Sequence, residues 1–214
     1  MRSRLITLLL LTGAIASAVV IDRIAIIIDN KMIVKDSDIR RDIRVTSFLN
    51  NQRPDLSPAS QKQAANRLID QIFIRREIEL GGYPQATLQQ ADQQLDSLEK
   101  ERFRSQTALN AALRSYSLNA LDLRFRFQWQ LTVLRFINSR FKPAVLISDD
   151  EIEKYYRDHA AELRRQFPGR SSLNDLRDDI RDLLTDERVN QQFFAWLDAQ
   201  RKDTKIQYLE ADLR

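Results

Sequence analysis

The feature that most constrains the fold is the absence of both Gly and Pro from residues 85–142. These two residues most often interrupt regular secondary structure, and the whole chain of 214 residues contains only 4 Gly and 5 Pro. That composition disfavours β-sandwiches, Gly-rich phosphate-binding loops and collagen-like repeats. Leu, Ala, Arg, Gln, Asp and Glu are abundant, and they favour long helices. We therefore expect a mainly α fold.

The composition also excludes several kinds of site. The chain has no Cys, which excludes disulfides, thiolate metal sites and a cysteine nucleophile. A single His cannot form a cluster of histidine ligands, and we expect no metal or other cofactor. The net charge is +4, falls to +2 without Arg2 and Arg4, and comes from interspersed charges. That pattern is typical of a solvated, ion-paired helical surface and predicts no nucleic-acid interface.

The N-terminus has the form of a secretory signal. A short segment with two Arg precedes an apolar stretch at residues 5–15, and the tripeptide Ala-Ser-Ala at 16–18 fits a cleavage site. We predict a signal peptide at residues 1–18 and a mature chain that works outside the cytoplasm. A retained membrane anchor is the alternative, because the uncharged run extends to residue 21 and so reaches the lower length limit for crossing a bilayer.

Short strands are expected at both ends of the mature chain. Residues 20–28 are mostly apolar and β-branched, which favours a strand. The tripeptide Asp-Asn-Lys at 29–31 is a turn signal, because Asn and Asp tolerate left-handed backbone conformations. Residues 32–34 form the return strand, and residues 206–209 could form a closing strand. We expect the first and last segments to close on each other.

Periodicity, capping residues and helix breakers divide the remainder into seven helices. Ser57 and Pro58 start the second, because Ser caps a helix and Pro suits the first helical position. Ser148 and Glu151 form a capping box at the start of the sixth, which we expect to be short. The first begins with Asp36 or Ser37 as its N-cap, and the others follow at about residues 58–80, 87–103, 105–116, 120–142, 149–156 and 172–202.

Residues 121–131 are ambiguous by periodicity alone. Apolar side chains alternate with polar ones in LDLRFRFQWQL, which is the pattern of a half-buried strand. Asn119 is a good N-cap, and Leu134, Ile137 and Phe141 continue at helical spacing, so we predict a helix. Such a helix carries large apolar residues around most of its circumference. It must be buried on several sides or expose aromatics.

Three segments in this order resemble the SurA/PpiD family of periplasmic chaperones. Residues 19–39 resemble the family's opening strand, tight turn, second strand and capped first helix. Residues 147–156 (ISDDEIEKYY) resemble its junction helix, and residues 176–209 its closing helix and strand. The resemblance implies a multi-helix chaperone module with a small N-terminal β-hairpin. Residues 19–142 would form an N-terminal lobe, and residues 143–214 the junction helix, closing helix and strand.

The departure from that family concerns its enzymatic part. Family members usually carry one or two parvulin-type prolyl isomerase domains between the junction helix and the final helix. Here residues 157–171 lie between them, which is too few for such a domain, and no parvulin signature occurs elsewhere. We therefore expect a chaperone module that is not an enzyme. A divergent prolyl isomerase is the weaker alternative.

Large aromatic side chains are the candidates for binding unfolded polypeptides. A cleft of aromatic and aliphatic groups can hold the apolar side chains of an extended segment without reading its sequence. For each of these residues the competing interpretation is an ordinary place in the core, and we expect partial exposure first of Trp129 and Trp196. The six candidates are Phe125, Phe127, Trp129, Phe136, Phe193 and Trp196.

Two polar features have simpler interpretations than a site. His159 is the only histidine, and no nucleophile or second acid accompanies it, so we interpret it as a surface residue near a helix C-terminus. The acidic run at 149–151 is explained by helix capping, because a metal cage needs ligands from several loops.

These expectations combine into one functional hypothesis. The resemblance implies an ATP-independent periplasmic holdase whose partners are unfolded clients, including outer-membrane β-barrel precursors. Reversible burial of apolar segments would keep the strand edges of clients from pairing. The alternative is a non-enzymatic adaptor with one fixed partner in envelope assembly. Contact with the membrane is expected only if the leader is retained as an anchor.

Overall fold

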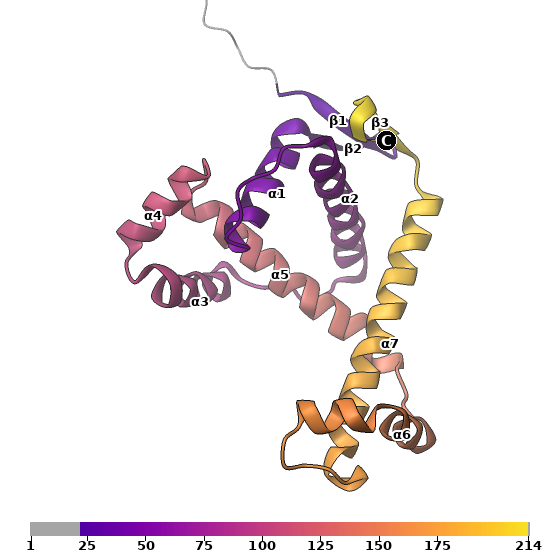
Figure 1. The fold of residues 1–214 in the computed structure, drawn as a ribbon. Helices are drawn as coiled ribbons and strands as arrows, with labels where there is room; N and C mark the ends of the chain where they lie inside the picture. The colour runs from indigo at the N-terminus through magenta and orange to yellow at the C-terminus, as the bar shows by residue number, and fades with distance from the viewer. Residues whose placement is uncertain (1–21, 214) are drawn as a thin grey trace, which may run out of the picture.

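A helical body and a smaller lobe make up the part of the chain that the structure describes. This computed structural model describes residues 22–213, so the predicted signal peptide lies outside the described residues. Figure 1 shows a small sheet at one end of the body and the lobe at the other end, joined to the body by helix α7 (Leu173–Asp203). The fold is mainly α, as the composition predicts.

The sheet brings the two ends of the described chain together. Its antiparallel strands are β1 (Ile24–Ile28), β2 (Met32–Lys35) and β3 (Ile206–Tyr208), in the order β2–β1–β3. Ile27 in the central strand lies opposite Ile33 on one side and Gln207 on the other. The hairpin turn has positive φ angles at Asp29 and Asn30, which confirms the turn predicted from their tolerance of that region.

Helices α1 (Asp36–Leu49) and α2 (Pro58–Gly81) follow the hairpin. The prediction that Asp36 or Ser37 caps α1 is wrong, because Lys35 occupies the N-cap position and its N–H donates to the Asp38 carboxylate. The Ser37 hydroxyl instead donates to Asp22 at 2.6 Å. The start of α2 is as predicted, with Ser57 as its N-cap and Pro in the first turn.

Helices α3 (Leu88–Leu98), α4 (Gln106–Ser115) and α5 (Ala120–Arg140) form the next part of the body. The predicted third helix ends in a π-helical turn, Glu99–Phe103, before the chain reverses at Arg104 with φ 61°. The ambiguous segment 121–131 is helical. The Asn119 side chain caps α5 by accepting hydrogen bonds from the backbone N–H groups of Leu121 and Asp122, at 2.8 and 3.3 Å.

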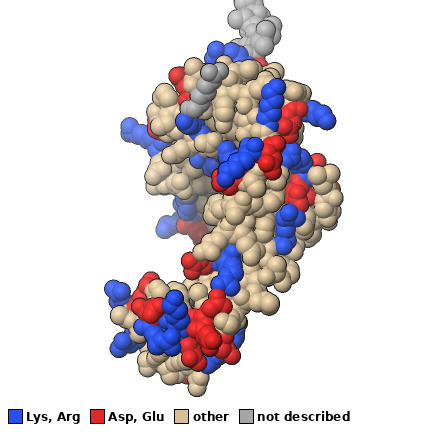
Figure 2. Space-filling model, turned by 90° about the vertical axis from the view of Figure 1, so that its right-hand side faces the viewer, with Lys and Arg blue, Asp and Glu red and all other residues tan. Residues whose placement is uncertain are grey.

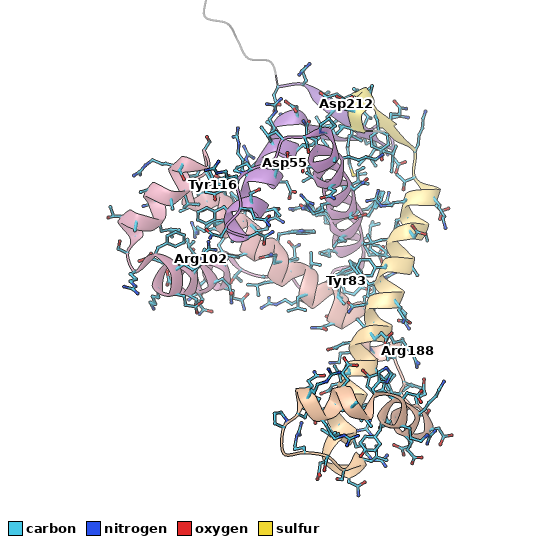
Figure 3. All side chains as sticks on the ribbon, viewed as in Figure 1. Asp55, Tyr83, Arg102, Tyr116, Arg188 and Asp212 are labelled. Atoms are coloured by element: carbon cyan, nitrogen blue, oxygen red, sulfur yellow. The ribbon has the colours of Figure 1, made fainter. Side chains whose placement is uncertain are left out.

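The lobe consists of helix α6 (Asp149–Gln166) and the N-terminal half of α7. The predicted short sixth helix corresponds to the first part of α6, which ends at a kink at His159 where the backbone leaves helical geometry; a second helical stretch continues beyond the kink to Gln166. At the base of the lobe, Arg188 of α7 donates to the Leu146 carbonyl at 2.8 Å and to Glu151 at 2.5 Å (Figure 3). These bonds join the connector, α6 and α7 at one point.

Three separate apolar clusters stabilise the described chain. The largest joins the sheet, α1, α2, α5 and the C-terminal half of α7, and it includes Leu213 from the last turn of the chain. A second cluster packs α1 against α3, α4 and α5 around Phe48 and Leu113. The lobe has a cluster of its own: Ile152, Leu163, Leu176 and Ile180. Helix α7 contributes to the first and third clusters and so connects the body to the lobe.

Candidate functional site

An open cavity of about 430 Å³ lies between α2, α5 and α7, and we refer to it as the apolar cavity. Two large side chains at this cavity are exposed to solvent: Phe194 is 64% exposed and Leu134 is 56% exposed. Phe193, the neighbour of Phe194, is 8% exposed and belongs to the main cluster. The lining residues are Arg67, Asp70, Gln71, Ile74, Arg126, Trp129, Gln130, Val133, Leu134, Ile137, Phe193, Phe194 and Leu197.

A second cavity of about 380 Å³ lies where β2, α1, α2 and α5 meet, and we refer to it as the polar cavity. Its walls combine apolar side chains with three Asp and three Arg. Phe125, which is 57% exposed, lies in its lining. The lining residues are Ile33, Val34, Asp38, Arg41, Asp42, Val45, Leu68, Gln71, Ile72, Arg75, Asp122, Phe125, Arg126 and Trp129.

The two cavities adjoin at Gln71, Arg126 and Trp129, which line both of them. The guanidinium carbon of Arg75 lies 4.3 Å from the centroid of the Trp129 ring, within cation–π distance. Trp129 therefore presents one side chain to both cavities.

A buried ion network fixes the helices between the cavities. The Asp42 carboxylate of α1 is almost fully buried and accepts bonds from Arg67 of α2 at 2.6 Å and from Arg126 of α5 at 2.7 Å. The same Arg126 nitrogen also donates to the Thr46 hydroxyl at 3.0 Å. A buried carboxylate with two guanidinium partners is costly to disturb. The network therefore holds α1, α2 and α5 in one arrangement around the two cavities.

The six predicted site residues divide between cavity and core. Phe125, Trp129 and Phe193 line the cavities described above. Phe136 is fully buried in the main cluster and makes ring contacts with Phe141 and Trp196. Trp196 and Phe127 are half-buried, Trp196 against the main cluster and Phe127 against the second cluster, and neither lines a cavity described here.

Sequence reasoning missed the two most exposed apolar residues of the apolar cavity. Leu134 and Phe194 have the same helical spacing as their buried neighbours, so periodicity gives no signal that separates them from the core. Figure 2, which faces the α7 side of the molecule, shows charges of both signs on the body and on the lobe, with tan surface between the charged groups of the body. The exposed apolar side chains of the apolar cavity, Leu134 and Phe194, lie on α5 and on the C-terminal half of α7.

The polar features of the lobe are structural. The Ser148 hydroxyl caps α6, and Arg188 donates to Glu151, which lowers the pKa of Glu151 to about 2. His159 lies where the first helical stretch of α6 ends, in agreement with the prediction of a position near a helix C-terminus. It lies at the kink of α6, where its ring stacks on Tyr155 with 4.1 Å between centroids. Within residues 22–213, no group of His, Asp and Glu is arranged to hold a metal ion.

Comparison with known proteins adds no functional assignment. No protein-family model matches the chain, and no curated protein matches it. Among the helices of the described residues, none has the length and hydropathy needed to cross a membrane. The cavity walls offer apolar side chains, an Arg75 guanidinium over the Trp129 ring and polar hydrogen-bonding groups.

Proposed function

We propose that this chain is an ATP-independent periplasmic holdase that binds unfolded envelope proteins, including outer-membrane β-barrel precursors. The observation that carries the proposal is the apolar cavity, at which Phe194 and Leu134 stay exposed although a packed core lies directly beside them. Exposed apolar side chains in a concave site mark a binding surface more often than an isolated exposed residue does. The resemblance of the sequence to periplasmic chaperones supports the same proposal.

Binding would proceed by reversible burial of apolar client segments. An extended segment places alternate side chains on one face, and these can enter the apolar cavity between α5 and α7. Covered segments cannot pair with other exposed strand edges, so aggregation is suppressed. Because the walls contact side chains of many shapes without a fixed hydrogen-bond pattern, we expect weak binding of many clients.

The proposal is tested by aggregation of urea-diluted clients, followed by light scattering. The chain without residues 1–18 is mixed with an unfolded outer-membrane β-barrel protein and, separately, with an unfolded soluble enzyme. We expect suppression of barrel aggregation near stoichiometric ratios. No suppression of either client by a protein that is shown to be folded would contradict the proposal.

A matched pair of double variants locates the activity. L134S/F194S removes the two exposed apolar side chains of the apolar cavity, and we expect it to lose most of the suppression. L80S/L146S removes two side chains that are even more exposed, at 79% and 83%, and that line neither cavity. This control should keep full activity. Equal loss in both variants would show that general surface hydrophobicity, and not the cavity, suppresses aggregation.

The same assay separates the holdase from an adaptor. An adaptor recognises one folded partner and ignores denatured clients, whereas a holdase binds unfolded chains and releases them when they fold. If neither client is protected and one native envelope protein binds stoichiometrically, the adaptor interpretation replaces the holdase.

A further inference from the structure

Arg75 is a cation of the polar cavity that has no carboxylate partner. The two other arginines in the lining are paired: Arg41 lies 3.5 Å from Asp122, and Arg126 lies 2.7 Å from Asp42. Among the described residues, none forms a hydrogen bond or an ion pair with the Arg75 side chain. Its position in the cavity is set instead by contact with Trp129. The cavity thus presents one positive charge whose donors are unused.

The stacked position leaves the hydrogen-bond donors of Arg75 available. A guanidinium that stacks on an aromatic ring contacts the ring with its flat face. Its N–H donors point outward in the plane of the guanidinium, so stacking does not use them. Arg75 is exposed, yet the surrounding protein removes enough water to lower its pKa. Glu79, one turn along α2, acts in the opposite direction and only at longer range. The group stays charged, because arginine is not deprotonated in proteins.

The acidic groups of the cavity are already compensated. Asp42 and Asp122 belong to the ion pairs described above. Asp38 lies in the first turn of α1, where its carboxylate accepts the Lys35 N–H at 3.2 Å and faces the positive end of the helix. The free donors of Arg75 therefore match a negative group that comes from outside the chain.

We propose that the polar cavity binds a carboxylate next to an apolar side chain of a client, with Arg75 as the carboxylate receptor and Trp129 as the platform. This inference rests on the holdase proposal and names the client chemistry that the site selects. A planar carboxylate can accept two parallel N–H bonds from a guanidinium. Leu68 and Ile72 in the same wall offer contact to the adjacent apolar side chain. An acidic side chain or a free chain terminus can supply the carboxylate.

The test compares the affinities of peptides that differ in a single charge. One apolar peptide, acetylated and amidated, carries a central Glu, a second carries Gln there, and a third carries Lys. A fourth keeps the Gln but ends in a free carboxylate after an apolar residue. We expect the Glu peptide to bind about threefold to tenfold tighter than the Gln peptide, with a smaller difference at high salt. The Lys peptide should bind most weakly, and the fourth peptide shows whether a chain terminus serves as well.

Two variants assign the preference to Arg75. R75Q should make the Glu and Gln peptides bind equally. R114Q should keep the preference, because Arg114 is an exposed arginine of α4 that lines neither cavity. A W196F background leaves Trp129 as the only Trp of the chain, so quenching of its fluorescence reports binding at the proposed platform. Calorimetry on the unsubstituted protein gives the same affinities without relying on that background.

The outcomes separate this inference from the holdase proposal. Equal binding of the Glu and Gln peptides by the unsubstituted protein overturns the carboxylate site, and so does a preference that survives R75Q. In both cases the apolar cavity and the holdase proposal still stand. If no peptide binds, the carboxylate site also falls, and the light-scattering assay then decides whether the holdase proposal falls with it.

Discussion

Truncation of two adjacent phenylalanines should separate client binding from stability. Phe193 is 8% exposed, and its ring centroid lies 5.8 Å from that of Phe141 and 6.1 Å from that of Trp196. F193A leaves a cavity in this ring cluster and should lower the free energy of unfolding by about 3–5 kcal/mol. Phe194 is 64% exposed, so about a third of its roughly 200 Å² is covered by protein. At about 25 cal/mol per Å², F194A should cost less than about 2 kcal/mol.

The exposed areas predict that Phe194, whose loss costs less stability than that of Phe193, contributes more to client binding. About 130 Å² of Phe194 remains to be covered, and a client that covers half of it gains about 1.6 kcal/mol, or roughly tenfold in affinity. Urea unfolding followed by circular dichroism measures the stability change, and anisotropy of a labelled apolar peptide measures the affinity. F194A should therefore bind the peptide about tenfold more weakly while it stays folded. If F194A binds as well as the unsubstituted protein, Phe194 is not part of the client site and the argument from exposed area fails.

Three further predictions concern the framework that surrounds the site. D42A removes the carboxylate between two guanidinium groups and should lower the free energy of unfolding by about 3–5 kcal/mol in urea titrations. The buried Ala86 N–H donates to the Thr132 hydroxyl at 3.0 Å. T132V removes this acceptor and should lower the free energy of unfolding by about 1–3 kcal/mol in the same assay. Glu151 has a folded-state pKa of about 2, below its ordinary 4.5, mainly because Arg188 donates a hydrogen bond to it. Its stabilising contribution is therefore full above about pH 4.5 and is lost as the pH falls towards 2. A thermal melting series should show a steeper acid decline for the unsubstituted protein than for E151Q, and parallel declines would refute this assignment.

The helix boundaries could be predicted from the sequence because capping is a local interaction. Asn119 and Ser148 each bond to backbone N–H groups within three residues, so the signal and the structure it produces lie in the same short segment. The cap of α1 is the exception. Asp22, 15 residues before Ser37, accepts the Ser37 hydroxyl, and Lys35 takes the N-cap position. Local sequence thus predicts the wrong N-cap here, because Ser37 bonds to Asp22, which lies outside the segment that the prediction considers.

The division between core and cavity could not be predicted, because it depends on segments that are distant in the sequence. Phe125 and Phe136 lie on the same helix, yet one is 57% exposed and the other is fully buried. Phe136 is buried because α7, from the far end of the chain, places Trp196 against it with 5.6 Å between the ring centroids. Phe125 lies near the other end of α5, where the polar cavity is open. The apolar pattern of α5 indicates that several elements pack against the helix, but it does not show which parts of the helix they leave uncovered.

Helix α5 explains why both cavities occur in this fold. Its apolar circumference requires neighbours on several sides, and α1, α2 and α7 supply them without closing completely around it. Leu123 and Thr132 face packed protein, whereas Trp129 lies between two open cavities. The Asp42 network joins α1, α2 and α5 at fixed positions and so sets the width of the space between them. Weakening that network should therefore change the affinity for clients through the width of the cavities, in addition to lowering stability. R126K keeps the charge but removes the forked donor. We expect it to change the free energy of peptide binding more than the free energy of unfolding, which would separate the effect on cavity width from the effect on stability.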